Sequence, residues 1–249
     1  MCSVSWLLEE HGYQVFFNRD EQKSRALALP PKKYRVNNVD VMMPLDPTGG
    51  GSWISMNEFG LSVCLLNNYQ GVLPSNSLFS RGLLLKHLAS SANTEGVTQA
   101  FQRIDLNNFA PFTLLAFDPQ LNCNFGCVMA YRWDGESFYI QDTESPLFSS
   151  GFDLINVQAY RQSVYDELTK LGKNQENLLA FHSHHHPKHS HMSTCMHRED
   201  AHTVSFTHLQ SHKGQHSMFY APGSPCHPLK PNQLDHSRYS FDRSAVLNS

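Results

Sequence analysis

The chain has 249 residues, of which 40% are hydrophobic and 16% are charged, and its formal net charge is −3 at pH 7. This composition supports a sizeable core in one large domain or two small ones, and it argues against nucleic acid as the main partner, because phosphate binding needs clustered lysines and arginines. We read no run of about 18 apolar residues, no signal peptide and no disulfide framework, so we predict a cytoplasmic protein with reduced thiols and no membrane span.

The first elements along the chain form a predicted β-hairpin. Segments 2–8 and 13–17 are apolar and β-prone, and the break at Glu10-His11-Gly12 joins them. The stretch 22–48 follows, and we predict an irregular loop there because Pro30-Pro31 and Pro44 oppose long regular structure.

Later segments alternate strands with helices. Further strands are predicted at 52–56, 61–66, 112–117, 125–133, 137–141, 201–209 and 217–221. Helices are predicted at 77–90, 95–104, 156–171 and 174–181, the third from the spacing of Val157, Tyr160, Val164, Leu168 and Leu171. Such alternation favours an α+β fold whose sheets are covered by helices.

Cys2 directly follows the initiator Met1. Because its side chain is small, methionine aminopeptidase could remove Met1 and leave a thiol and a free α-amine on one residue. Such a residue holds a nucleophile together with its general base, and the two groups titrate within about one pH unit of each other. A cysteine at position 2 can also be accidental, so the downstream segments decide its interpretation.

Four downstream segments have a distinctive order. They are Asn18-Arg19-Asp20-Glu21, Gly50-Gly51-Ser52-Trp53, Gly60 followed seven residues later by Asn67, and Met196-His197-Arg198 leading to Thr203-Val204. Together with Cys2, this series resembles the NRDE family, the Transport and Golgi organisation 2-like proteins, over residues 1–221.

That family is similar to N-terminal nucleophile hydrolases of the bile-salt hydrolase and penicillin V acylase type. The resemblance implies a four-layer αββα sandwich, in which two stacked antiparallel sheets have helices outside. We therefore expect a single domain over residues 1–221 and an irregular C-terminal extension over 222–249.

The resemblance also implies roles for individual residues. Cys2 would attack a carbonyl carbon, and the Arg19 guanidinium beside it would lower the thiol pKa and orient it. Asp20 would hold the α-ammonium, and Asn67, in preference to Asn68, would donate to the oxyanion. The alternative for Arg19 and Asp20 is a buried ion pair that closes the hairpin.

A second group of residues is assigned to substrate binding. These residues are Asn18, Trp53, Asn68 and Arg198. Arg198 would lie over the site or bind a substrate acid, and its alternative is an ordinary ion-paired arginine. The bile-salt hydrolase type has a further asparagine before a proline near mid-chain, but the nearest match here is Thr143-Glu144-Ser145-Pro146, so the second oxyanion donor is missing from the pattern.

The segment 182–191 is polar and rich in histidine, and we predict a loop there. With His197, the histidines are His182, His184, His185, His186, His189 and His191. Imidazole binds zinc, copper, nickel and haem iron, but no pair spaced His-x3-His lies on a convincing helix. We therefore expect adventitious metal affinity rather than a resident metal or cofactor, and we read Cys123 and Cys127 as ordinary thiols.

These expectations lead to two main functional hypotheses. The first is an amidohydrolase or acyltransferase that uses the N-terminal cysteine on a non-peptide C–N amide bond of a small molecule. The second is a non-catalytic binding or transfer protein on the same fold, with a haem or lipid-like ligand, as the missing asparagine and segment 182–197 suggest. A metalloprotein that uses the histidine segment is a third, weaker reading.

Overall fold

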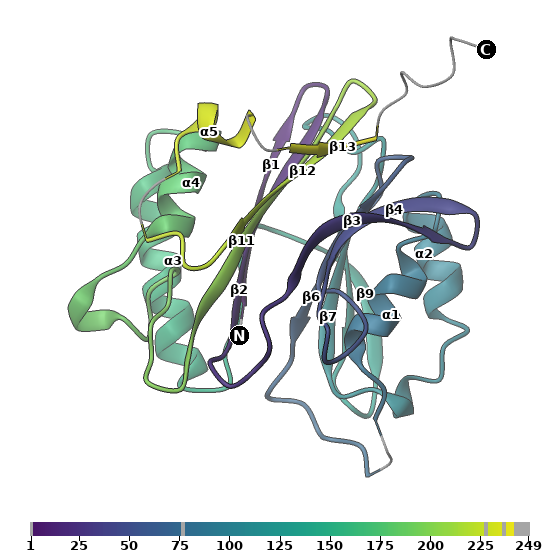
Figure 1. The fold of residues 1–249 in the computed structure, drawn as a ribbon, viewed down its shortest axis with the longest axis horizontal. Helices are drawn as coiled ribbons and strands as arrows, with labels where there is room; N and C mark the ends of the chain where they lie inside the picture. Colours follow the sequence, from purple (N-terminus) through teal and green to yellow (C-terminus); the bar gives the residue numbers. More distant parts are fainter. Residues whose placement is uncertain (1, 76–77, 227–228, 236–237, 242–249) are drawn as a thin grey trace.

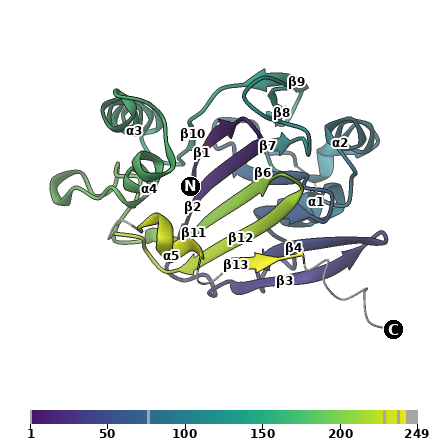
Figure 2. The same ribbon diagram turned by 90° about the horizontal axis from the view of Figure 1, so that it is seen from above.

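Two antiparallel β-sheets stack face to face in the computed structural model, which describes residues 2–75, 78–226, 229–235 and 238–241 (Figure 1). Helices cover the outer face of each sheet, so the layers run helix, sheet, sheet, helix (Figure 2). The predicted α+β fold and its αββα sandwich are confirmed. Among the described residues, no helix has the length and apolar character needed to cross a membrane.

The first sheet carries the N-terminus. Its six strands have the order β10-β1-β2-β11-β12-β13. Their bounds are β1 Cys2–Glu9, β2 Gly12–Gln22, β10 Leu147–Ser149, β11 Ala201–His212, β12 Gln215–Pro222 and β13 Arg238–Ser240. The predicted hairpin at the start of the chain is β1 paired with β2, and β2 lies in the middle of the sheet against β11.

The second sheet is a meander in which each strand pairs with its neighbour in sequence. Its seven strands have the order β3-β4-β5-β6-β7-β8-β9. Their bounds are β3 Leu29–Val36, β4 Val39–Leu45, β5 Ile54–Asn57, β6 Ser62–Asn67, β7 Phe112–Phe117, β8 Val128–Trp133 and β9 Phe138–Thr143.

The helices complete the outer layers. They are α1 Arg81–Leu88 and α2 Thr94–Phe101 on the seven-stranded sheet, α3 Leu154–Thr169 and α4 Gln175–Ser183 on the other, and α5 Pro231–Asp235. Two 3-10 turns occupy Leu106–Asn108 and Pro187–His189. Ser80 caps α1 by accepting a hydrogen bond from the Gly82 backbone N–H, and Ser77, where this helix was predicted to begin, lies outside the described residues.

The prediction of an irregular loop over 22–48 was wrong, because strands β3 and β4 lie within it. The prolines fall where a strand tolerates them. β3 is an edge strand, and the pairing of β3 with β4 shifts register between Leu29 and Lys32, opposite the region of Pro44. A proline at an edge or an irregularity removes no required ladder hydrogen bond.

Two further expectations need correction. His182 belongs to α4 and is fully buried, and this helix ends at Ser183, so the polar loop begins after Ser183. The stretch after residue 221 contains α5 and β13, and β13 extends the first sheet by pairing with β12. The division into a domain over 1–221 and an extension over 222–249 remains a prediction.

Candidate active site

Cys2 is the first residue of β1, which lies between β10 and β2 in its sheet. It lies opposite Arg19 of β2 and opposite Ser149 of β10 in the antiparallel pairing. Residues directly opposite in an antiparallel sheet project from the same face. That face points between the two sheets, where Cys2 packs with Val4 and Trp6 and is 8% exposed.

A cavity of about 420 Å³ opens at Cys2 and brings five of the predicted site residues together. They are Cys2, Arg19, Asp20, Trp53 and Asn67. The cavity is also lined by Arg81, at the start of α1. Strands of both sheets and the first turn of a helix thus meet around one thiol.

Close backbone packing places α1 at this cavity. A Cβ on Gly51 would lie 2.1 Å from the carbonyl carbon of Gly82, so only glycine fits there. The Ser52 backbone N–H donates to the Gly82 carbonyl oxygen at 3.2 Å. The Gly-Gly-Ser-Trp segment therefore brings the first turn of α1 to the wall that also carries Trp53.

Arg19 is held by both charge and an aromatic ring. Its Nη2 lies 3.1 Å from Glu21 Oε2 and 3.8 Å from Asp46 Oδ2, and its guanidinium carbon lies 4.2 Å from the centre of the Trp53 ring. A cation over an indole face is attracted by the ring quadrupole. The buried Trp53 Nε1 has no hydrogen-bond partner among the described residues.

Opposing effects act on the thiol. Burial raises the pKa of Cys2 and the negative charge of Asp20 adds to this, while the positive charge of the chain's N-terminus and, to a smaller extent, that of Arg19 lower it. A thiolate at Cys2 therefore needs a proton acceptor close by.

Asp20 lies in the same strand as Arg19 but its carboxylate meets the helical layer. Asp20 Oδ2 lies 3.4 Å from Nη2 of Arg161 in α3, and Asp20 Oδ1 accepts a hydrogen bond of 2.6 Å from Thr203 Oγ1. Both charged side chains are completely buried. Burial raises the pKa of Asp20, and the positive charge of Arg161 opposes this shift. The buried ion pair offered as an alternative for Arg19 and Asp20 is therefore absent among the described residues, because Asp20 pairs with Arg161.

A second cavity adjoins the first at Asn67. Its volume is about 540 Å³, and Asn67, Ser149, Arg132 and Tyr139 are among the residues that line it. Asn67 lines both cavities, and its Nδ2 donates to Tyr69 Oη at 3.0 Å. The buried Ser149 Oγ has no hydrogen-bond partner among the described residues. Ser149, rather than the segment Thr143–Pro146, is thus the mid-chain residue beside Cys2.

Three predicted substrate-binding residues do not line the cavity at Cys2. Asn18 Nδ2 donates to the carbonyl oxygens of His182 and Thr194, which ties β2 to the helical layer. Asn68 Oδ1 accepts from the Gln70 backbone N–H and lines the second cavity. Arg198 Nη2 lies 2.7 Å from Asp200 Oδ2, which is the ion pair of its alternative, and its role in substrate binding remains a prediction.

The geometry agrees with a comparison of the whole sequence with family profiles. The profile of Transport and Golgi organisation 2 matches residues 1–219. The chain belongs to this family. No curated protein is similar enough in sequence to be counted as a relative.

Solved structures show the fold of this Transport and Golgi organisation 2 family member. Penicillin V acylase from Agrobacterium tumefaciens matches with a TM-score of 0.53 and 13% identity, over 89% of this chain and 83% of the acylase. An N-acylethanolamine-hydrolyzing acid amidase ortholog from Caenorhabditis elegans matches with a TM-score of 0.54 and 12% identity, over 97% and 100%. A mutant conjugated bile acid hydrolase from Clostridium perfringens matches with a TM-score of 0.51 and 15% identity, over 97% of each chain. The fold is therefore that of N-terminal nucleophile hydrolases.

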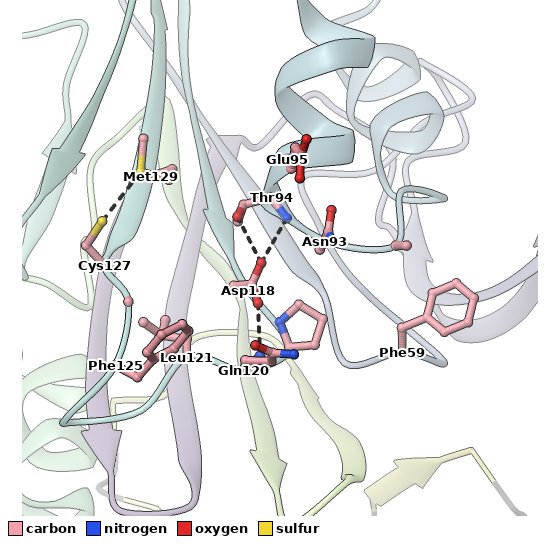
Figure 3. A pocket seen from close by; sticks show the side chains of 13 residues that line it. Phe59, Asn93, Thr94, Glu95, Asp118, Gln120, Leu121, Phe125, Cys127 and Met129 are labelled. Carbon is pink, nitrogen blue, oxygen red and sulfur yellow. Dashed lines mark hydrogen bonds between the residues drawn. The ribbon is translucent and has the colours of Figure 1, made fainter.

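A third cavity lies away from these residues, between the start of α2 and the segment before β8 (Figure 3). Its volume is about 530 Å³, and none of the predicted site residues lines it. Asp118, a half-buried acid of this cavity, accepts hydrogen bonds from both the backbone N–H and the hydroxyl of Thr94, at 3.0 and 2.8 Å. Because this carboxylate is engaged by the first residue of α2, the cavity at Cys2 is the better candidate for chemistry.

Sequence reasoning missed three residues of the site in this Transport and Golgi organisation 2 family member. The sequence pattern could have indicated that Arg161 is buried, because it lies four residues after Val157, on the buried face of α3. No sequence pattern indicates Arg81 or Ser149, since their places depend on the packing of α1 and on the pairing of β10 with β1.

Proposed function

We propose that this protein is an N-terminal nucleophile amidase or acyltransferase that cleaves a non-peptide C–N amide bond of a small molecule, with Cys2 as the nucleophile once Met1 has been removed. One observation carries the proposal. Cys2 pairs with Arg19 on one side and with Ser149 on the other, it lines the first cavity while Ser149 lines the second, and Asn67 lines both.

The proposed reaction begins with transfer of the thiol proton to the α-amine of Cys2. The sulfur attacks the carbonyl carbon, and the carbonyl oxygen becomes an oxyanion that accepts hydrogen bonds from Asn67 Nδ2 and Ser149 Oγ. The C–N bond then breaks, the leaving nitrogen takes the proton from the α-ammonium, and a thioester remains on Cys2. Water or a second amine attacks the thioester and releases the acid or a new amide. Asp20, a residue of the cavity wall whose carboxylate is held by Arg161 and Thr203, would hold the α-ammonium in place.

The two cavities suggest where the two parts of a substrate bind. The group on one side of the amide bond would occupy the cavity beside Trp53, and the group on the other side would occupy the cavity beside Tyr139. Arg81 has no carboxylate partner among the described residues, and its Nη1 donates to the carbonyl oxygen of Pro111 at 2.8 Å. The remaining donors of this guanidinium suit an anionic group on the arm that fills the cavity at Cys2.

The experiment that tests the proposal is intact mass spectrometry of untagged protein before and after exposure to a thiol-acylating probe. We expect the untreated protein to lack the mass of Met1. After exposure to the probe, we expect a single adduct, and peptide mapping should locate it on Cys2. The double variant C123S/C127S, which removes two exposed thiols, should still form the adduct, while Cys2→Ala should not. Retention of Met1, or adducts confined to other cysteines, would overturn the proposal and favour a binding protein on the same fold.

A further inference from the structure

Two cysteines and a histidine meet on the helical side of the first sheet, apart from the cavity at Cys2. Cys226 Sγ lies 3.3 Å from Cys195 Sγ and 2.9 Å from His197 Nε2, and Cys195 Sγ lies 3.7 Å from the same nitrogen. Cys195 is completely buried, while His197 and Cys226 are half-buried. Three soft donor atoms thus face one another within 4.8 Å.

We propose that Cys195, His197 and Cys226 bind one zinc ion. Two thiolates and an imidazole are a donor set that zinc favours in proteins, and they leave one tetrahedral position for a further ligand. This assignment differs from our expectation of only adventitious affinity in the histidine segment, because the decisive ligands are two cysteines far apart in sequence.

The surroundings of the cluster support a built site. His185 Nδ1 lies 3.1 Å from the Cys195 carbonyl oxygen, and the rings of His185 and His197 have centroids 4.6 Å apart. A histidine whose one nitrogen is held by a carbonyl presents the other to a metal, so we assign His185 to the fourth position. Its ring would turn toward the metal on binding, because its nitrogens lie outside the group of three donor atoms.

The backbone around the cluster is already fixed. The Cys195 backbone N–H donates to the His184 carbonyl oxygen at 2.9 Å, and the His197 backbone N–H donates to Ser190 at 3.0 Å. Gly223, three residues before Cys226, donates to the Val204 carbonyl oxygen at 2.8 Å. Zinc at this cluster would tie the segment after β12 to the loop before β11, and we assign it a structural role.

A pair of thiols at this distance has a second chemical outcome. The sulfurs are farther apart than the roughly 2.05 Å of a disulfide. An added disulfide reagent would oxidise them: the two thiols lose their protons, two electrons pass to the reagent, its S–S bond breaks to give two thiols, and the bond between Cys195 and Cys226 forms. Zinc binding and disulfide formation exclude each other at these two residues. An experiment on the reduced full-length protein separates them.

The test is elemental analysis and thermal melting of the tag-free, reduced full-length protein, stripped with a chelator and then given zinc alone. We expect one zinc per chain, a rise in Tm on adding zinc, and a thiolate-to-metal absorption band when cobalt(II) replaces zinc. Cys226→Ser, a change at a half-buried position, should abolish all three, while C123S/C127S should leave them intact.

Three results would overturn the zinc site. They are no stoichiometric zinc in the reduced protein, zinc retained in Cys226→Ser, and zinc lost equally from C123S/C127S. The zinc content and the melting temperature are read without any substrate, so they test this site independently of the proposed activity of Cys2.

Discussion

Arg161 and Asp20 form a completely buried ion pair that joins α3 to the strand carrying Arg19, with 3.4 Å between Nη2 and Oδ2. Arg161 also donates to Ser3 Oγ at 2.6 Å and to the carbonyl oxygens of Met192 and Ser193 at 3.0 and 2.9 Å. One side chain therefore connects the strand of the nucleophile, the next strand and the loop before β11.

Replacing Arg161 with methionine should lower the free energy of unfolding by about 3–5 kcal/mol, because it leaves the buried Asp20 charge without a partner. Denaturant titration measures this loss. Adding Asp20→Asn to the same variant should recover part of it, since an amide carries no charge. The half-exposed pair of Arg198 and Asp200 provides the control, because Arg198→Met should cost only about 0–1 kcal/mol. Equal losses in the two variants would contradict the buried role of Arg161.

Ser149 gives a prediction that separates catalysis from stability. Its hydroxyl has no partner among the described residues, so Ser149→Ala should change the free energy of unfolding by less than about 1 kcal/mol. If the hydroxyl donates to the oxyanion, the same change should slow acylation of Cys2 by about 10²-fold or more. Mass spectrometry of a single turnover with an activated acyl probe measures this rate.

The matched control for Ser149 is Ser55, whose buried hydroxyl also has no partner among the described residues but which lies in β5. Ser55→Ala should leave the acylation rate unchanged. An unchanged rate in Ser149→Ala as well would remove Ser149 from the proposed mechanism.

The sequence could predict what depends on local patterns. The hairpin of β1 and β2 places Cys2 opposite Arg19, and its apolar strands and turn residues specify that pairing without help from the rest of the fold. The apolar repeat likewise located α3: Val157 is buried, and Val164 and Leu168 pack against the core. The repeat extended too far and did not include Arg161. Leu171 lies beyond the helix and is 99% exposed, whereas Arg161 is buried.

The remaining features depend on contacts between distant segments. Ser149 becomes a neighbour of Cys2 only because β10 pairs with β1, and no spacing in the sequence encodes that pairing. Cys226 meets Cys195 after β11 and β12 have turned the chain back on itself. The β3–β4 hairpin was missed because its prolines oppose strand structure locally, while the edge position and register shift accommodate them.

Arg81 should determine which substrates the protein prefers. Charge-assisted hydrogen bonds contribute about 1.5–3 kcal/mol, so Arg81→Gln should raise KM about 10- to 150-fold for an amide whose arm ends in a carboxylate. The same variant should barely change KM for the matching substrate with a neutral carboxamide. Arg103→Gln, an exposed arginine that does not line the cavity at Cys2, is the control and should affect neither substrate. A similar rise for charged and neutral substrates would show that Arg81 acts on packing rather than on charge.

His182 should make the protein sensitive to acid. It is completely buried, its Nε2 lies 2.9 Å from Ser5 Oγ, and burial lowers its pKa to about 3. Because an unfolded histidine titrates near 6.5, the unfolded state holds one more proton than the folded state between about pH 6.5 and pH 3. The free energy of unfolding should therefore fall with decreasing pH, by about 1.4 kcal/mol per pH unit from this residue.

Denaturant titration at several pH values between 4.5 and 7.5 measures the slope, and the variant His182→Gln isolates the contribution of the imidazole. That variant should be less stable at pH 7 but should lose stability more slowly as the pH falls. His208, whose pKa burial also lowers, would keep the remaining slope positive. His87→Gln, at an exposed position of α1, should leave the slope unchanged. If His182→Gln retains the full slope of the parent protein, the acid sensitivity comes from other groups.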